Sequence, residues 1–134
     1  MFDLTGHVAL VTGAGQGMGL GVARALAAQG AKVAVNDYYA ERAQKGASLI
    51  CDTGKTAIGI SADVTDPASI KDMIAEIERR LGPVDILVNN AGIPVKGVKY
   101  AKFMETKRED LDIYIDLNLR GVMNCVRAVL PGMC

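Results

Sequence analysis

The sequence has few of the residues that mark a disulfide-bonded, metal-binding or membrane protein. Its 134 residues include three cysteines and one histidine, with no C-x-x-C spacing, so we expect neither a disulfide framework nor a zinc or other metal site. The apolar runs are only a few residues long, far short of the ~20 that span a bilayer. The start of the chain also lacks the basic and apolar regions of a signal peptide. We therefore expect a cytoplasmic protein.

The charge balance argues against nucleic acid or a membrane surface as a partner. Fifteen lysines and arginines match fifteen aspartates and glutamates, so no global field favours nucleic acid or a membrane surface as a partner. The length suits about one domain with a real core. No repeat, low-complexity tract or linker divides the chain, so we treat residues 1–134 as one domain.

Short β-branched runs alternate with longer helical patterns along this domain. The expected strands are residues 7–12, 32–36, 56–61 and 84–89, and the expected helices are residues 17–29, 40–53, 67–81 and 106–131. Alternation of this kind is typical of β-α units that feed a parallel sheet through right-handed crossovers. It predicts an α/β fold.

The starts of the last two helices carry the clearest capping signals. Asp66 can cap the third helix, and Pro67 suits its first turn. Thr106 and Glu109 have the spacing of a capping box, which predicts that the last helix begins there and continues toward Pro131.

A glycine-rich segment follows the first expected strand. Residues 12–19 read Thr-Gly-Ala-Gly-Gln-Gly-Met-Gly, with Gly13, Gly17 and Gly19 in the spacing G-x-x-x-G-x-G. Such a turn before a helix can hold a pyrophosphate against the free N–H groups of the helix. The spacing differs from the general dinucleotide fingerprint G-x-G-x-x-G, so a purely structural turn is the alternative at this point.

Polar or small residues end the other strands too. Asp37 closes the second strand and can accept hydrogen bonds from ribose hydroxyls, although a turn aspartate is the alternative. A carboxylate there would repel a 2′-phosphate, which favours NAD over NADP, whereas Arg42 is the residue that opposes this preference. Asp63 and Val64 follow the third strand, and residues 89–92 (Asn-Asn-Ala-Gly) follow the fourth. Ligands of open α/β sheets bind at this edge.

Together these motifs resemble the short-chain dehydrogenase/reductase family. The resemblance rests on residues 12–19, Asp63 and Val64, residues 89–92, and the later segment Asp116-Leu117-Asn118-Leu119-x-Gly121. It covers nearly the whole chain. It implies a Rossmann-type doubly wound parallel sheet, here with about four strands in the order 3-2-1-4 and helices on both faces.

The resemblance also implies roles for individual residues. The residues that it places against the pyrophosphate are Gly13, Gln16, Gly17, Met18 and Gly19. It places Asp37 at the adenosine ribose and Asp63 with Val64 at the adenine. Asn90, Ala91 and Gly92 would flank the ribose on the nicotinamide side, and Asn118 matches the catalytic asparagine that orders a water in the proton relay. Thr12 and Asn89 would brace neighbouring strands.

The remaining catalytic residues of the family are a serine and a Tyr-x-x-x-Lys pair, and neither can be placed in these 134 residues. We therefore expect the amino-terminal half of an NAD-dependent enzyme that moves hydride between NAD(H) and a secondary alcohol or ketone, with negligible turnover by this chain alone. The alternative is a noncatalytic NAD-binding or interaction module, such as a truncated or split product.

Self-association is a further expectation. The fourth strand is apolar and has no later strand to pair with its far edge. The last helix is also expected to expose apolar surface at Val122, Val126 and Val129. We therefore expect homo-oligomers formed through this strand and this helix.

Overall fold

A single parallel sheet forms the centre of the computed structural model, which describes residues 2–95 and 101–134. Its strands are β1 (Val8–Val11), β2 (Lys32–Asp37), β3 (Ala57–Ser61) and β4 (Ile86–Val88). They are hydrogen-bonded in the order β3-β2-β1-β4, and every pairing is parallel. The predicted strand order is confirmed.

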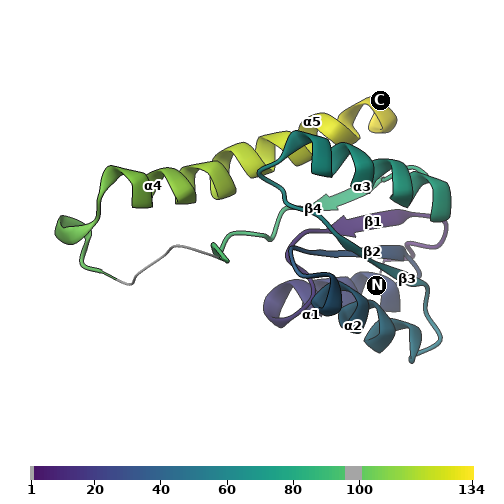
Figure 1. Ribbon diagram of the computed structural model, residues 1–134. Coiled ribbons are helices and arrows are strands. Elements are labelled where there is room, and N and C mark those ends of the chain that lie inside the picture. The colour runs from purple at the N-terminus through teal and green to yellow at the C-terminus, as the bar shows by residue number, and fades with distance from the viewer. Residues whose placement is uncertain (1, 96–100) are drawn as a thin grey trace.

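Helices cover both faces of the sheet. They are α1 (Gly17–Ala28), α2 (Ala40–Cys51), α3 (Pro67–Arg80), α4 (Arg108–Ile115) and α5 (Gly121–Met133). Figure 1 shows α1 and α2 on one face, with α3 and α5 on the other. The arrangement confirms the predicted doubly wound α/β fold.

The alternation of side chains along the strands divides the core in two. In β1, Val8 and Leu10 join the core under α3 and α5, whereas Ala9 and Val11 join the core under α1 and α2. Strands buried on both faces of the sheet are continuous apolar runs in the sequence, which is why the sequence predicts β1 and β2.

The capping prediction is right for α3 and wrong for α4. The Asp66 carboxylate accepts a hydrogen bond from the Ala68 N–H at 3.0 Å. The Thr106 hydroxyl instead donates to the Phe103 carbonyl at 2.6 Å, within the 3₁₀ turn η1 (Phe103–Glu105). The helix therefore begins after Lys107, whose N–H donates to the Asp110 carboxylate at 3.0 Å.

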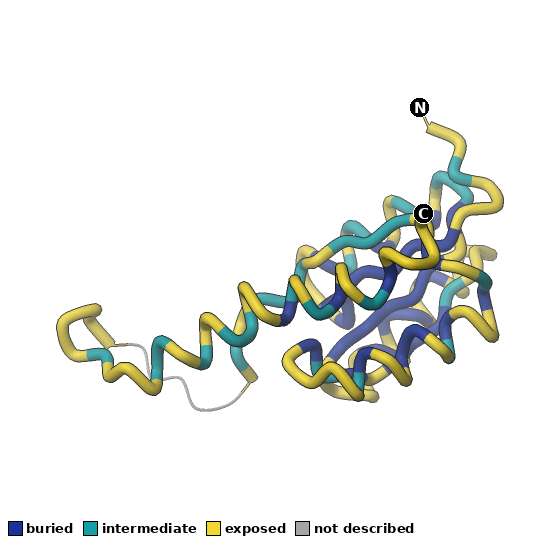
Figure 2. Tube along the Cα trace, turned by 90° about the horizontal axis from the view of Figure 1, so that it is seen from above, coloured by how far each residue is buried: buried dark blue, intermediate teal, exposed yellow. Residues whose placement is uncertain are grey.

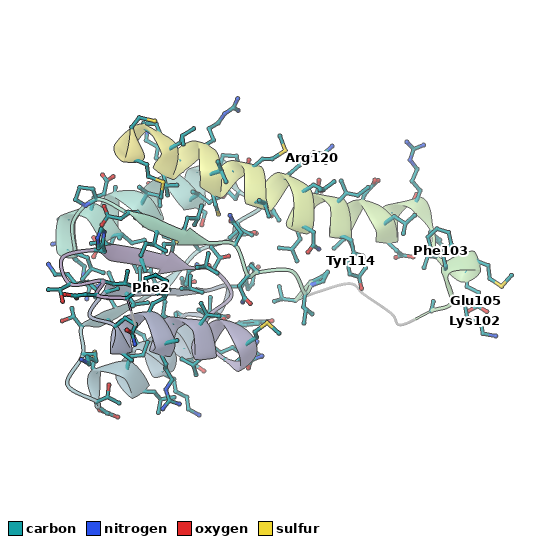
Figure 3. The ribbon with its side chains drawn as sticks, turned by 180° about the vertical axis from the view of Figure 1, so that it is seen from behind. Phe2, Lys102, Phe103, Glu105, Tyr114 and Arg120 are labelled. Atoms are coloured by element: carbon teal, nitrogen blue, oxygen red, sulfur yellow. The ribbon has the colours of Figure 1, made fainter. Side chains whose placement is uncertain are left out.

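The expected last helix consists of three consecutive segments. The π-helical turn η2 (Asp116–Arg120) joins α4 to α5, and α5 continues through Pro131 to Met133. None of the described residues of η1, α4 and η2 is buried, and Figure 2 shows this arm extending from the buried sheet. Phe103 lies at its far end (Figure 3) and is 81% exposed.

The inner side of α5 packs against α3. Cys125 and Val129 are buried there, so the expectation that Val129 is exposed is wrong. The helix turns this residue toward the core, while Met123 and Leu130 face outward. Burial raises the pKa of the Cys125 thiol to about 11, which keeps the thiol protonated and unreactive at neutral pH.

Across residues 2–95 and 101–134, every helix is too short or too polar to cross a lipid bilayer.

The first prediction concerns the core under α3. Ile77 is fully buried there, so Ile77→Ala should lower the free energy of unfolding by about 2–5 kcal/mol through lost burial and the cavity left behind. Urea denaturation followed by circular dichroism measures the change. Lys71→Ala on the exposed side of the same helix is the control, and a loss for Ile77→Ala as small as the ~0.5 kcal/mol of a surface site would contradict the packing.

Candidate functional site

The turn after β1 is tied to the segment after β4. The buried Thr12 hydroxyl accepts hydrogen bonds from the N–H groups of Asn90 and Ala91, both at 3.1 Å. The Asn90 side chain in turn donates two hydrogen bonds, to the carbonyls of Thr12 and Gly13, both at 3.0 Å. These contacts bring two predicted motifs together although about 77 residues separate them. The bracing role expected for Thr12 is present, whereas Asn89 is exposed.

Three glycines shape this turn in different ways. A Cβ on Gly13 would lie 2.9 Å from the Cα of Ala91, and one on Gly19 would lie 2.4 Å from Nδ2 of Asn90. Side chains at these two positions would therefore force the turn and the β4 segment apart. Gly17 differs, because a Cβ there would face open space, although its φ of 60° is left-handed like the 61° of Gly13.

The start of α1 keeps its backbone donors free. The capping position is Gln16, whose side chain makes no capping hydrogen bond within the described structure, and the first turn contains no acidic residue. The start of α3, by contrast, is capped by Asp66, whose side chain accepts a hydrogen bond from the Ala68 N–H. An uncapped helix start presents N–H donors and a partial positive charge, which suits a phosphate group.

Asp37 is held in place at the end of β2. One carboxylate oxygen accepts the Gly15 N–H at 3.2 Å, and the other accepts the Tyr39 N–H at 3.0 Å. The residue is 6% exposed. Each carboxylate oxygen keeps a further lone pair, so the fixed side chain can still accept hydrogen bonds from two neighbouring hydroxyls.

Asn36 is a site residue that the sequence reasoning missed. Its buried side chain donates to the carbonyls of Ile60 and Ala62, both at 3.3 Å, and accepts the Gly13 N–H at 3.4 Å. It thereby joins the ends of β2 and β3 to the glycine turn. The available signal is a polar residue at the end of a buried strand, next to Asp37.

The segment after β3 is fixed by local bonds and by α5. Asp63 accepts two hydrogen bonds from Thr65, from its N–H at 2.9 Å and its hydroxyl at 2.7 Å. Val64 is buried, and its carbonyl accepts a bond from the Asn124 side chain at 3.1 Å. Both predicted residues therefore lie at the same sheet edge as Asp37.

Asn118 lies in the π-helical turn, a feature that often marks functional positions. Its side-chain amide donates to the carbonyls of Gly92 at 3.1 Å and Tyr114 at 3.2 Å. A Cβ on Gly92 would lie 2.7 Å from Oδ1 of Asn118. The glycine thus lets the long helix formed by α4, η2 and α5 (Arg108–Met133) approach the segment after β4.

The predicted binding residues come together around one cleft of about 890 Å³. All eleven line it: Gly13, Gln16, Gly17, Met18, Gly19, Asp37, Asp63, Val64, Asn90, Ala91 and Gly92. The volume lies within the usual range for ligand sites. Asn118 is joined to the wall of this cleft through Gly92.

The cleft also has walls outside the eleven predicted binding residues. The apolar residues Ile93, Pro94 and Val95 follow the β4 motif, and Ile113 and Leu117 belong to the long helix. Tyr38, Tyr39 and Arg42 line the end beside Asp37. Apolar walls that meet a few fixed polar groups are typical of small-molecule sites.

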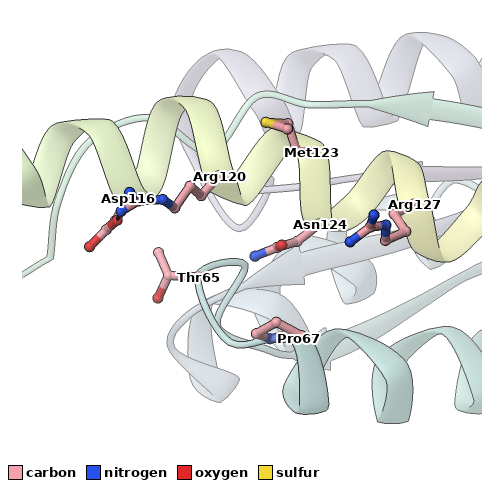
Figure 4. Close-up of a pocket in the computed structure, with 7 residues that line it drawn as sticks. All are labelled: Thr65, Pro67, Asp116, Arg120, Met123, Asn124 and Arg127. Carbon is pink, nitrogen blue, oxygen red and sulfur yellow. Dashed lines mark hydrogen bonds and ion pairs between the residues drawn. The ribbon is translucent and has the colours of Figure 1, made fainter.

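A second cavity of about 430 Å³ lies between the start of α3 and the long helix (Figure 4). Arg120 forms an ion pair with Asp116 there. Its walls include Pro67, Asn124 and Arg127 and none of the eleven predicted binding residues. The sequence motifs therefore identify the larger cleft as the candidate site.

Comparisons with known proteins agree with this geometry. A family model for short chain dehydrogenases matches residues 7–134. The chain is 41% identical to oxidoreductase UcpA of Escherichia coli K12 over 133 residues, which cover 99% of this chain and 49% of that protein. It is 40% identical to the 2,3-dihydro-2,3-dihydroxybenzoate dehydrogenase of Bacillus subtilis, covering 97% of this chain and 48% of that one.

A solved structure is similar over the same region. The 2-keto-3-deoxy-D-gluconate dehydrogenase of Streptococcus agalactiae aligns with a TM-score of 0.83 and 41% identity, over 98% of this chain and 48% of that one. The chain thus spans about half the length of the relatives it matches. Fold, motifs and identity agree that it belongs to the short-chain dehydrogenase family.

Proposed function

We propose that the cleft binds NAD(H), and that these residues are the cofactor-binding part of an oxidoreductase that moves hydride between NAD(H) and a secondary alcohol or ketone. The observation that carries the proposal is the convergence of all eleven predicted binding residues on one cleft. The relatives' names, which include oxidoreductases and dehydrogenases, support this reaction class.

Different regions of the cleft fit the pyrophosphate and the adenosine ribose of the dinucleotide. The uncapped start of α1 offers N–H donors to the pyrophosphate, and the open space at Gly17 leaves room for it. Asp37 can accept bonds from the hydroxyls of the adenosine ribose. Its negative charge favours a ribose hydroxyl over a 2′-phosphate, which supports NAD(H) as the preferred form.

The nicotinamide end is the segment from Asn90 to Gly92, beside Asn118. The bound nicotinamide supplies the hydride acceptor or donor. Asn118 commits its amide N–H groups to two carbonyls, which leaves its Oδ1 to accept a bond from a water. We assign it the role of holding that water for proton transfer.

The second prediction tests the cofactor site. Titration of the purified chain with NADH, followed by fluorescence or calorimetry, should show saturable binding. Gly19→Ala should weaken it at least about tenfold, or about 1.4 kcal/mol, because the new Cβ would displace the Asn90 side chain. Gly21→Ala in the same helix meets no neighbouring atom within 4 Å and should bind normally. Equal affinities for both variants, or no binding by folded wild-type chain, would contradict the site.

The third prediction concerns turnover. We expect negligible dehydrogenase activity from these 134 residues against a panel of secondary alcohols with NAD. A positioned proton donor contributes about 10² to 10⁴ in rate, and the family's Tyr-x-x-x-Lys pair is not among them. Absorbance at the NADH band measures the rate. A robust rate would refute both this expectation and the alternative of a noncatalytic NAD-binding module.

The fourth prediction follows from apolar residues on the outer side of α5. Met123, Val126, Leu130 and Met133 are 67%, 39%, 49% and 40% exposed, and β4 is hydrogen-bonded to β1 alone within the described sheet. We propose that a second copy of the chain covers these surfaces. Light scattering should show dimers or larger species, and Leu130→Glu should reduce them more than Lys71→Glu on α3. Monomers at high concentration would refute self-association.

A further inference from the structure

The end of β2 binds the glycine turn through three consecutive N–H groups. The Gly13 N–H donates to Oδ1 of Asn36 at 3.4 Å, and the Ala14 N–H donates to the Asn36 carbonyl at 2.7 Å. The Gly15 N–H donates to the Asp37 carboxylate at 3.2 Å. Two adjacent residues of β2 therefore hold three donors of the turn, and these donors are not available to a ligand.

The donors that remain lie at the start of α1. The side chain of Gln16 makes no capping hydrogen bond. The N–H groups of residues 17–19 precede the first intrahelical bond, which the Leu20 N–H donates to the Gln16 carbonyl at 3.3 Å. A pyrophosphate in the cleft would therefore meet the donors of residues 17–19 and not the three donors that β2 holds.

The Asn36 side chain is itself fixed by the end of β3. It is 1% exposed, and its Nδ2 donates to the carbonyls of Ile60 and Ala62, both at 3.3 Å. An amide nitrogen has two hydrogens, and both are used here. The side chain is thus held in one orientation, with Oδ1 toward the Gly13 N–H.

These three bonds need a side-chain amide. A position that accepts one N–H and donates to two carbonyls requires the oxygen and the NH₂ group that an amide carries. An aspartate would place a carboxylate against two carbonyl oxygens. A leucine, which is similar in size, would leave three backbone groups without a partner, and this is costly in a buried position.

We propose that Asn36 is a positioning residue for the pyrophosphate of the bound dinucleotide. It fixes the first part of the glycine turn against β2 and β3, so that the free N–H groups at the start of α1 face the phosphates. The inference rests on the proposed dinucleotide site and deepens it. It divides the residues predicted at the pyrophosphate into two groups, because Gly13 shapes the turn whereas residues 17–19 donate to the ligand.

The fifth prediction compares adenosine with ADP, which adds only the diphosphate, in calorimetric titrations of the purified chain. Wild-type chain should bind ADP at least about tenfold more tightly than adenosine, because the free donors bind phosphate. Asn36→Leu should reduce this preference to about twofold or less, because the donors lose their fixed direction. Circular dichroism confirms that the variant is folded.

Gln44→Leu is the matched control. The Gln44 amide also donates to a carbonyl of β3, that of Gly59 at 3.1 Å, but Gln44 is not among the residues that line the cleft. Its loss should lower stability and leave the preference for ADP over adenosine as in the wild type. A merely structural role of Asn36 would give the same result in both variants.

Amide hydrogen exchange tests the assignment of donors without any substitution. In the free wild-type chain, the N–H groups of Gly13, Ala14 and Gly15 should already exchange slowly, because β2 holds them. Those of residues 17–19 should exchange quickly and become slow only at saturating ADP. Nuclear magnetic resonance of the labelled chain resolves the two groups.

The outcomes separate this inference from the proposed function. A folded Asn36→Leu variant that keeps the wild-type preference, or a Gln44→Leu variant that loses it equally, overturns the positioning role. Slow exchange of residues 13–15 that appears only with ADP overturns it as well, as does binding of NADH with no preference for ADP over adenosine. Failure of folded wild-type chain to bind either NADH or ADP overturns the proposed function itself and this inference with it.

Discussion

The four hydrogen bonds between the β1–α1 turn and the segment after β4 are the contact on which the site depends. The Thr12 hydroxyl accepts two backbone N–H groups, and the Asn90 amide donates to two carbonyls. Because each side chain is satisfied by the other segment, neither turn can move without leaving part-buried polar groups unpaired, which is costly. Gly13 and Gly19 are small for the same reason, since any larger residue would separate the two segments.

Around this contact, the two sides of the sheet are packed differently. The core under α1 and α2 is rich in alanine, including Ala23, Ala27 and Ala47, whereas the core under α3 and α5 uses larger residues such as Ile70 and Ile77. Small residues let α1 lie close to β1 and β2, so its uncapped start reaches the edge of the sheet where the cleft opens. Packing far from the cleft thus decides where the free N–H donors point.

The strand ends could be predicted because their signals are local. A buried parallel strand is a short apolar run, and a polar residue that closes it must lie at the carboxyl edge of the sheet. Asp37, Asp63 and Asn90 were located in this way, and the structure brings them to one cleft. The start of α4 was misplaced because Thr106 serves the preceding 3₁₀ turn. Val129 was placed on the wrong side of its helix for lack of a known packing partner.

The sequence alone determined the order of the elements, because periodicity and capping are local. Its motifs carry the family resemblance, and that resemblance implies which residues bind the dinucleotide. Only the tertiary structure decided which side chains hold the residues of the cleft in position. The clamping role of Asn36, the shared position of Gly15 between Asp37 and Arg42, and the ring contact of Arg42 with Tyr39 all depend on contacts between segments. Such contacts carry no local pattern, since they exist only once the parallel strands bring their carboxyl ends to one edge.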